Sequence, residues 1–521
     1  MLSSSLLLFT FALTSGAAKV VDLGYARYQG IADAPTNITS FLAVRYAAPP
    51  TGFLRWRAPE APGNVTGVQL ADTNPPACLQ GARGTSLVNP LQSRAEGGEP
   101  SEDCLFLNVF TPDIKPKELL PTIVWIHGGA YAIGSAQDYN GLDLAAELDG
   151  AAVVVVLQYR LGLFGFLAGN EVKNDGALNA GLLDQQFALR WVNRNIGRFG
   201  GDASRVTLWG QSAGAGSIMQ HMIANGGKTS PKLYSAGILS SPFLPQQYPY
   251  NHWVPQAIFD GVASQAGCGN HTTLDCLRAV DAATLETINL NTILQGFQGT
   301  STFVPVVDGK LIQQSPTDAF LEKKTNGGSL LAMTNVEEGF VFVNQEQDYN
   351  VEEYVQQLFP TVGKKESTLI AATYAGLGSP VQQATKIMTD SIFICPAFTV
   401  LEGFRGNSFK GEYGILPSFH GDDLRYYFPR FTAFPNSPVF NNTEFIEAFR
   451  QAFFSFALHR DPNTQVHRTI TPTWPLWDKD AKEMVLNRTD AGNADVRVEA
   501  VDSELLQRCE LWKSLRGKTF Q

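Results

Sequence analysis

The sequence predicts an α/β fold, in which a large, mostly parallel central sheet carries helices on both faces and a small antiparallel sheet lies at the N-terminal edge. Three observations support this expectation. Short apolar runs rich in Val, Ile and Leu recur through the middle of the chain, amphipathic segments lie between them, and turn-rich segments precede both. Alternating strand and helix patterns are typical of a parallel sheet that is covered on both sides.

The predicted strands of the central sheet are short apolar runs. Because each is only a few residues long and apolar at consecutive positions, it is typical of a strand buried on both faces. These runs cover residues 122–126, 152–157, 206–209, 235–239 and 329–333. Earlier in the chain, the turn residues of the segments 48–52 and 58–59 suit short antiparallel strands at the sheet edge.

The predicted helices follow from the spacing of apolar residues. Residues 182–196 (LLDQQFALRWVNRNI) and 445–458 (FIEAFRQAFFSFAL) place apolar side chains near i, i+3, i+4 and i+7. Residues 213–222 are also expected to be helical, directly after the strand that ends near Trp209.

The N-terminus has the pattern of an export signal. An apolar run from Leu6 to Leu13 is followed by the small residues Ser15 to Ala18, as at a cleavage site, and the run is too short to span a bilayer. We therefore expect a signal peptide at 1–18, a single domain at 19–521 and a secreted, extracellular protein.

Two further features agree with export. The six cysteines, an even number, suit disulfides in an oxidising compartment, although six allow fifteen pairings. Five N-x-S/T triplets are candidate glycosylation sites. The cysteines are Cys78, Cys104, Cys268, Cys276, Cys395 and Cys509, and the triplets begin at Asn37, Asn64, Asn270, Asn441 and Asn487.

The charge pattern limits the partners of the chain. The formal net charge is -10, and the Lys and Arg residues are scattered rather than grouped in a basic run. A chain of this kind is not expected to bind nucleic acid or anionic membrane surfaces, and we expect no stable membrane anchor.

The segment GQSAGAG, residues 210–216, predicts an activated serine. Ser212 stands between a predicted strand and a predicted helix, at the edge of a parallel sheet where catalytic groups gather. Side chains two residues before and two residues after it would collide with the neighbouring strand and helix, which explains Gly210 and Gly214. A serine in this turn needs a base, a group that orients the base, and donors for an oxyanion.

The donors are expected from the segment His127-Gly128-Gly129-Ala130, which ends an earlier strand. Its position matches that of an oxyanion loop, so the backbone N–H groups of Gly129, Ala130 and Ala213 are the candidates. Small residues there would let a substrate approach the main chain closely.

Among the seven histidines, His420 is the candidate base because it follows an apolar segment and lies late in the chain, in the order serine, acid, histidine. The acid is expected after the strand that ends near Met333, where Glu337 and Glu338 are adjacent and the pattern does not choose between them. Asp308 is a competing acid, although a turn cap is its more ordinary role.

These segments resemble the type-B carboxylesterase/lipase family, which includes cholinesterases and fungal lipases. FGGDASRVTLWGQSAG at 199–214 resembles its serine signature, and EDCLFLNVFTP at 102–112 resembles its second signature. YAAPPTGFLRWRAP, WIHGGAY, YRLGLFGFLA and GLLDQQFALRWVNRNI are also similar to family segments, so the resemblance spans most of the chain.

The resemblance implies an α/β-hydrolase fold and several residue roles. The family acid precedes a glycine, which selects Glu338, and the segment FHGDDL selects His420. The resemblance further implies structural salt bridges Arg55–Glu102 and Arg160–Asp184. The disulfide pairs that it implies are Cys78–Cys104, Cys268–Cys276 and Cys395–Cys509.

The chain departs from the family in four features, and those of residues 79–103 bear on the substrate. Gln211 stands where cholinesterases and many lipases carry glutamate, and Ala130 replaces a third glycine. Residues 79–103 contain no tryptophan, so a cation–π site for choline is not expected. The same segment is short and poorly amphipathic, unlike a lid that meets an oil surface.

Together these features predict a secreted carboxylic ester hydrolase that acts on soluble or moderately apolar esters through an acyl-enzyme, with no metal and no cofactor. Two alternatives remain: a lipase or sterol esterase acting on lipid esters, and a non-catalytic adhesion or binding relative. The expected partner is a small-molecule ester. The sequence leaves the natural ester and the oligomeric state open.

Overall fold

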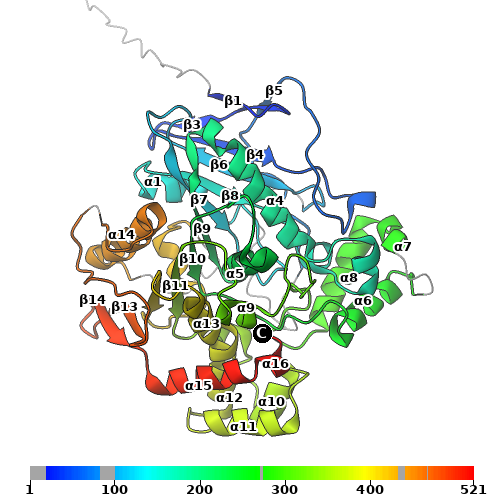
Figure 1. Cartoon of the computed structure of the whole chain (residues 1–521), viewed down its shortest axis with the longest axis vertical. Coiled ribbons are helices and arrows are strands. Elements are labelled where there is room, and N and C mark those ends of the chain that lie inside the picture. The colour runs from blue at the N-terminus through cyan, green and yellow to red at the C-terminus, as the bar shows by residue number, and fades with distance from the viewer. Residues whose placement is uncertain (1–18, 82–99, 270–273, 432–439, 466) are drawn as a thin grey trace, which may run out of the picture.

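The fold is organised around one long twisted sheet (Figure 1). The structure, a computed structural model, describes residues 19–81, 100–269, 274–431, 440–465 and 467–521. Within these residues the sheet has eleven strands, in the order β14-β13-β12-β11-β10-β9-β7-β8-β6-β4-β3, beside a second sheet of three strands, β1-β2-β5. The predicted signal peptide, residues 1–18, lies outside the described residues.

The centre of the large sheet is parallel, as predicted. Each predicted apolar run overlaps a strand that pairs parallel with at least one neighbour. These strands are β7 (Leu120–Ile126), β8 (Val153–Leu157), β9 (Gly201–Gln211), β10 (Ala236–Ser240) and β11 (Ser329–Asn335), and β12 (Ser408–Tyr413) and β13 (Lys482–Arg488) continue the parallel order.

The edges of the sheet are antiparallel. β3 (Ile31–Asp33), β4 (Ile38–Arg45) and β6 (Phe106–Thr111) extend one edge, and β14 (Ala494–Ala500) closes the other against β13. In the small sheet, β1 (Val20–Asp22) pairs antiparallel with β2 (Arg27–Gln29), and β5 (Val68–Leu70) adds one parallel pairing.

Helices cover both faces of the sheet because alternate strand residues point into two cores. In β8, Val153, Val155 and Leu157 pack into the core that holds α4 (Ala180–Asn195) and α5 (Ala213–Gly227). Val154 and Val156 pack into the opposite core, with α1 (Gly141–Glu147) and the phenylalanines of α14 (Thr443–His459). Successive side chains of a strand point to opposite faces, so one apolar strand contributes to both hydrophobic cores.

The three predicted helical segments correspond to α4, α5 and α14. Asn442 caps α14 by accepting a hydrogen bond from the N–H of Phe445 at 3.0 Å. The remaining helices are α2 (Gly162–Phe166), α3 (Asn170–Asp175), α6 (Trp253–Gln265), α7 (Leu274–Ala279), α8 (Ala282–Leu294), α9 (Pro316–Leu321), α10 (Val351–Leu358), α11 (Lys364–Tyr374), α12 (Pro380–Thr389), α13 (Cys395–Gly403), α15 (Ser503–Ser514) and α16 (Arg516–Thr519).

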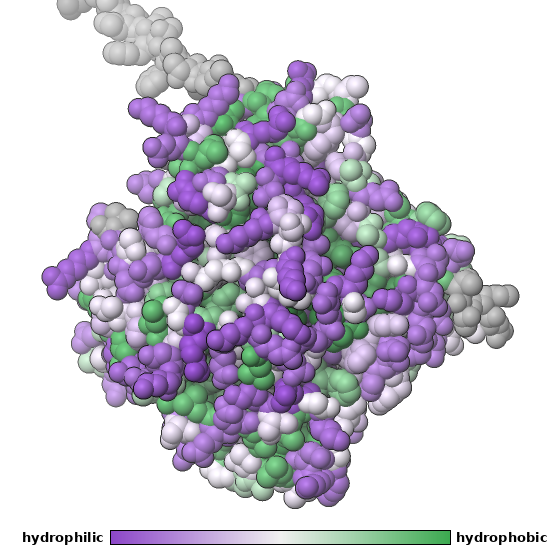
Figure 2. Space-filling view, in the orientation of Figure 1, coloured by the Kyte–Doolittle hydropathy of each residue, from purple (hydrophilic) through white to green (hydrophobic). Residues whose placement is uncertain are grey.

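The segment Pro380–Gly403 is long and apolar enough to cross a membrane, but 94% of its most apolar window is buried inside the protein. It is therefore a core helix, formed by α12, the π-helical turn η4 (Asp390–Ile394) and α13. On the face drawn in Figure 2, hydrophilic residues cover most of the surface and smaller apolar groups lie between them.

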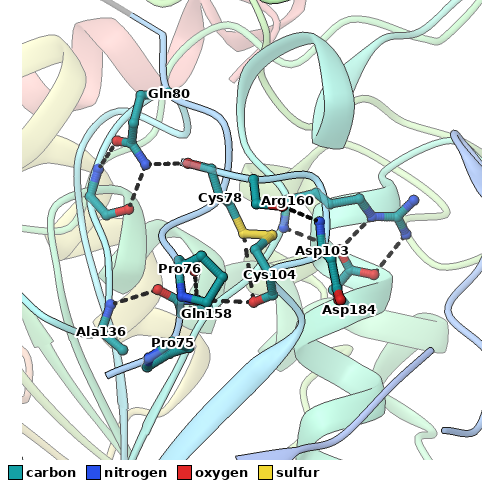
Figure 3. The surroundings of a disulfide bond; sticks show 12 residues. Pro75, Pro76, Cys78, Gln80, Asp103, Cys104, Ala136, Gln158, Arg160 and Asp184 are labelled. Atoms are coloured by element: carbon teal, nitrogen blue, oxygen red, sulfur yellow. Dashed lines mark hydrogen bonds and ion pairs between the residues drawn. A yellow bond between two sulfur atoms is a disulfide. The ribbon is translucent and has the colours of Figure 1, made fainter. Parts of the chain in front are cut away.

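The three cysteine pairs implied by the resemblance are joined in the structure. Cys395–Cys509 links α13 to α15 across 114 positions, whereas Cys268–Cys276 closes a loop of only eight. Cys78–Cys104 lies beside the buried Arg160–Asp184 pair (Figure 3), and the second implied salt bridge, Arg55–Glu102, is also present at 2.5 Å.

Removing the long bridge should destabilise the protein more than removing the short one. For the double replacement Cys395→Ser with Cys509→Ser, the chain-entropy relation gives a loss of about 5 kcal/mol of unfolding free energy. For Cys268→Ser with Cys276→Ser it gives about 2.5 kcal/mol. Denaturant unfolding of both double variants measures the difference, and equal losses would contradict the entropic account.

Candidate active site

Ser212 lies in a sharp turn between β9 and α5. Its backbone has φ 56° and ψ -125°, a conformation that side-chain-bearing residues adopt only when the surroundings enforce it. The enforcing bonds run from Ser212 N–H to the carbonyl of Ser240 at 3.0 Å, and from Gly216 N–H to the carbonyl of Ser212 at 2.8 Å. The turn holds the serine at the carboxyl end of a central parallel strand.

Glycines on both sides of Ser212 are required by close backbone packing. A Cβ at Gly214 would stand 2.0 Å from the carbonyl oxygen of Ile126, and a Cβ at Gly210 would stand 2.7 Å from the carbonyl carbon of Gly214. Neither distance is possible for a real side chain, so the turn excludes every other residue type at these two positions.

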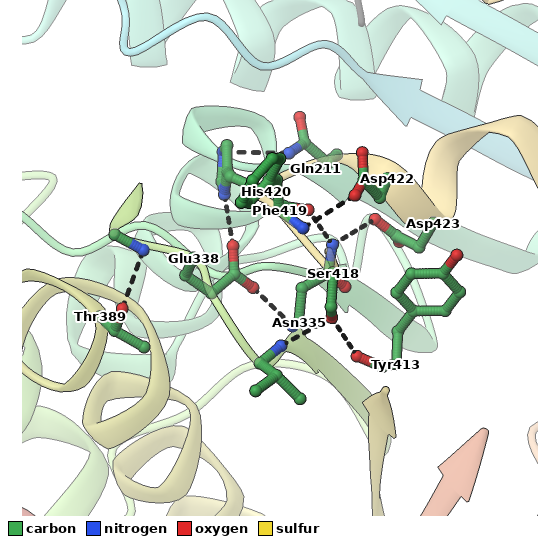
Figure 4. Close-up of polar contacts among 12 residues, drawn as sticks. Gln211, Asn335, Glu338, Thr389, Tyr413, Ser418, Phe419, His420, Asp422 and Asp423 are labelled. Atoms are coloured by element: carbon green, nitrogen blue, oxygen red, sulfur yellow. Dashed lines mark hydrogen bonds and ion pairs between the residues drawn. The ribbon is translucent and has the colours of Figure 1, made fainter. Parts of the chain in front are cut away.

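The candidate base and acid are directly paired (Figure 4). His420 Nδ1 lies 2.5 Å from Glu338 Oε2, and both side chains are almost completely buried. The second carboxylate oxygen, Oε1, accepts a hydrogen bond from the backbone N–H of Asn335 at 2.7 Å. These two bonds orient the carboxylate toward the ring, which is the arrangement that keeps a proton on Nδ1.

The neighbouring glutamate has a different environment. Glu337 points outward and pairs with Lys386 at 2.8 Å, with about a quarter of its side chain exposed. Glu338, at 0% exposure, has no such cation and faces His420 instead. Burial and partner thus separate two residues that the sequence pattern left equivalent.

The hydrogen bond that links His420 to the turn of Ser212 is made by Gln211. Within the described residues, no hydrogen bond joins Ser212 Oγ to the imidazole; instead Gln211 Nε2 lies 3.1 Å from His420 Nε2 (Figure 4). Because Gln211 directly precedes Ser212, the ring faces the segment that carries the hydroxyl. Such bonds are often long in enzymes without substrate and tighten in the complex.

The loop that carries His420 is held from several sides. Ser418 Oγ accepts a hydrogen bond from Val336 N–H at 2.9 Å, and Phe419 N–H donates to Asp422 Oδ2 at 2.8 Å. The rings of Phe342 and Phe393 pack against the imidazole, with centroids 5.2 and 4.7 Å away. Phe419 and Asp422 lie in the segment FHGDDL, whereas Val336, Phe342 and Phe393 come from distant segments and have no signal in the sequence around His420.

A second buried carboxyl group lies behind the pair. Asp423 accepts hydrogen bonds from Tyr427 Oη and from Asn335 Nδ2, and Asn335 also bonds Glu338. Burial raises the pKa of Asp423 to about 7, and the charge of Glu338 acts in the same direction. Asp423 follows His420 by three positions, and this short spacing is the signal that could have identified it.

The candidate oxyanion loop turns sharply after β7. Gly129 has φ 104°, and Ala130 and Tyr131 have φ 58° and 62°, so the chain reverses over three consecutive residues with positive φ. In the described part of the chain, the N–H groups of Gly129, Ala130 and Ala213 donate to no protein acceptor. They are therefore available to an oxygen bound beside Ser212.

The far end of this loop is tied to the Cys78–Cys104 bridge. Gln80 Oε1 accepts from the N–H of Gly134 at 2.7 Å, and Gln80 Nε2 donates to the carbonyls of Gly134 and Cys78 (Figure 3). One glutamine thus connects the disulfide to the candidate oxyanion loop. Residues 82–99, which hold most of the segment interpreted as a poor lid, lie outside the described residues.

The other candidate groups of the sequence have structural partners. Asp308 accepts from the N–H groups of Lys310 and Ile312, as a turn cap does. Burial lowers the pKa of His127 and of His221 to about 4, and within the described residues neither ring is hydrogen-bonded to Ser212. Among the described residues, no group of three His, Cys, Asp or Glu side chains is placed to hold a metal ion.

A cavity of about 410 Å³ lies between α6, α8 and the loop 295–306. Aromatic and amide side chains such as Trp253, Phe297, Gln265 and Gln295 line it, and its lining residues include no Asp, Glu, Lys, Arg or His. The loop packs against Phe342, whose ring contacts His420, since a Cβ at Gly299 would stand 2.0 Å from the carbonyl oxygen of Phe342.

Comparisons with known proteins cover nearly the whole chain. The sequence profile described as "Carboxylesterase family" matches residues 17–512. The chain is 29% identical over 523 residues to "Secreted triacylglycerol lipase LIP1" of Gibberella zeae (89% of this chain, 87% of that protein). It is 30% identical over 495 residues to "Pyrethroid hydrolase Ces2e" of Rattus norvegicus (88% and 83%). The crystal structure of Aspergillus niger EstA is similar with a TM-score of 0.84 at 30% identity, covering 97% of this chain and 99% of that one.

Proposed function

Because the chain belongs to the carboxylesterase family, and is thus a serine carboxylic ester hydrolase of α/β-hydrolase fold, we propose that Ser212, His420 and Glu338 form its catalytic triad. The observation that carries this proposal is the buried contact of His420 Nδ1 with Glu338 Oε2 at 2.5 Å, beside the turn that bears Ser212. An imidazole held in this way presents the lone pair of Nε2 on the side of the serine.

The proposed mechanism is acyl transfer in two steps. His420 takes the proton of Ser212 Oγ as the oxygen attacks the ester carbonyl, and the N–H groups of Gly129, Ala130 and Ala213 stabilise the oxyanion. Glu338 stabilises the imidazolium, which then protonates the departing alcohol. Water attacks the acyl-enzyme by the same route, releases the acid and restores Ser212.

The proposed substrates are soluble or moderately apolar esters with uncharged acyl and alcohol groups. The segment 79–103 supports this choice, because it contains no tryptophan for a cationic alcohol group and is poorly amphipathic, unlike a lid that meets an oil surface. A relative named as a secreted triacylglycerol lipase favours the second candidate, a lipase acting on lipid esters.

A series of p-nitrophenyl and glycerol esters of increasing acyl length tests the proposal. We expect hydrolysis of short and medium esters below their solubility limit, with saturation and no further rise when an oil phase forms. A jump in rate above the solubility limit would favour the lipase, and a purified, folded protein that hydrolyses no ester in the series would contradict both candidates.

We also propose that residues 19–521 form a single secreted, glycosylated domain after cleavage of a signal at 1–18. The three disulfides support an oxidising compartment, and a relative is named as a secreted lipase. Asn37, Asn64 and Asn441 are exposed, as a glycan requires.

Glycan occupancy should differ among the candidate asparagines. Asn487 is half-buried in β13, and its side-chain amide packs against the bare α-carbon of Gly414, so we expect lower occupancy there than at Asn37, Asn64 and Asn441. Enzymatic deglycosylation in ¹⁸O water followed by peptide mass spectrometry measures each site. Equal occupancy at Asn487 in correctly folded protein would refute this prediction. Asn270 lies outside the described residues.

A further inference from the structure

The side chain of Gln211 lies between the candidate oxyanion loop and the imidazole of His420. It is 4% exposed, and its Nε2 is 3.1 Å from His420 Nε2 (Figure 4). On its other side, a Cβ at Gly128 would stand 2.8 Å from Gln211 Oε1 and 2.6 Å from the Gln211 carbonyl. The amide therefore occupies space that exists only because residue 128 has no side chain.

The direction of this hydrogen bond follows from the other side of the ring. His420 Nδ1 contacts the Glu338 carboxylate, which can only accept when ionised, so Nδ1 carries the proton. In the neutral imidazole Nε2 then has the free lone pair, and the amide of Gln211 must donate to it. This is the same lone pair that would receive the proton of Ser212.

We propose that Gln211 is a positioning residue that donates to His420 Nε2 in the free enzyme, orients the imidazole, and yields this lone pair to Ser212 when substrate binds. The inference rests on the proposed function, because it takes His420 as the base. It also accounts for the absence of a Ser212–His420 hydrogen bond in the described structure, since Gln211 occupies the acceptor.

The residue type at this position has a chemical consequence. A glutamine amide is neutral and can donate to the neutral ring, whereas a carboxylate can only accept and therefore favours the imidazolium. Because only the neutral ring can act as a base, glutamine at 211 should keep the enzyme active at lower pH than glutamate would.

The other titratable groups around the imidazole are the same in any variant of Gln211. Glu338 contacts the ring, and Asp423 reaches Glu338 through Asn335. The elements that pack against the ring also carry Asp422 on η5 (Asp422–Tyr426), Asp390 on η4, which pairs with Arg508, Glu337, which pairs with Lys386, and His127 beyond Gly128. Differences between variants therefore report on residue 211 itself.

The test compares Gln211→Glu and Gln211→Met with a matched control. Gln185 is also buried and bonds another buried histidine, with its Oε1 3.0 Å from His221 Nε2, but it lies on α4 and, among the described residues, makes no hydrogen bond to Gln211, Ser212 or His420. kcat/KM for a soluble p-nitrophenyl ester is measured from pH 5 to 9, and thermal unfolding is followed to verify that each variant is folded.

We expect Gln211→Glu to move the acidic limb of the pH profile upward by about one pH unit or more, so that kcat/KM at the acidic end falls about tenfold and recovers at high pH. Gln211→Met loses the hydrogen-bond donor without adding a charge. The acidic limb of its pH profile should therefore lie between the limbs of the wild type and of Gln211→Glu. Gln185→Met should leave the limb in place even if it lowers stability.

An acidic limb of Gln211→Glu that coincides with that of the wild type would overturn the inference. If that variant does not fold, an unshifted limb in folded Gln211→Met would overturn it equally. Failure of the proposed function gives a separate result, namely a wild type without esterase activity or a Ser212→Ala variant that retains it.

Discussion

Replacing Ser212 with alanine should lower kcat for ester hydrolysis by about a million-fold, the loss seen when the nucleophile of a triad is removed. Alanine lacks the oxygen that forms the acyl-enzyme, while the turn is held by backbone bonds at Ser212, Ser240 and Gly216 that do not need the hydroxyl. Steady-state kinetics of the purified variant, with thermal unfolding to verify an intact fold, measures the effect.

Covalent trapping gives an independent readout of the same prediction. A fluorophosphonate should phosphonylate Ser212 Oγ in the wild type with loss of fluoride, and peptide mass spectrometry should locate the adduct on the segment around residue 212. The double variant Ser212→Ala with His420→Ala should be no slower than Ser212→Ala alone, because the two residues act as a unit. Retained hydrolysis by Ser212→Ala, or an adduct on another serine, would refute the triad.

Replacing Glu338 with glutamine should lower kcat by about 10⁴-fold, because the new amide selects the wrong tautomer of His420. The backbone N–H of Asn335 donates to Glu338 Oε1 at 2.7 Å, so a glutamine would keep its oxygen there and turn its NH₂ group toward His420 Nδ1. Nδ1 would then have to accept, the ring proton would move to Nε2, and Nε2 could no longer take the proton of Ser212.

The adjacent residue is the matched control. Glu337→Gln removes a partly exposed pair with Lys386 and should change kcat by less than about fivefold, since exposed ion pairs contribute about 1 kcal/mol or less. Both variants are compared in kcat and in unfolding temperature. A similar loss of activity in the two variants would mean that Glu338 has no special role in orienting the imidazole.

The parallel sheet and its principal helices could be predicted from the sequence because their signals are local. The apolar run at 152–157 identifies a buried strand, and the apolar spacing in 445–458 identifies an amphipathic helix. Each signal lies within one short stretch of sequence. Strands β12, β13 and β14 were not predicted individually. β12 includes Lys410 within its buried face, where the ammonium pairs with Glu483 at 2.8 Å, and such a strand lacks the continuous apolar pattern.

The candidate site likewise has features that the local sequence predicts and features that depend on distant segments. The turn at Ser212 and the loop at Gly129 have local signatures, because steric exclusion of side chains by a nearby backbone acts on the residue itself. The choice between Glu337 and Glu338 depended on a family resemblance, and their physical difference is one of burial, which arises only when Lys386 and His420 arrive from distant segments.

The sequence by itself determined the fold class, the glycines around Ser212 and the serine-histidine order along the chain, because each depends on local backbone geometry or on short-range apolar spacing. Only the tertiary structure decided which groups surround the imidazole. Gln211 donates to Nε2, Asn335 joins Glu338 to Asp423, and Phe342 and Phe393 enclose the ring. Hydrogen bonds between side chains far apart in sequence have no local pattern, since their geometry is set by how the strands and loops pack together.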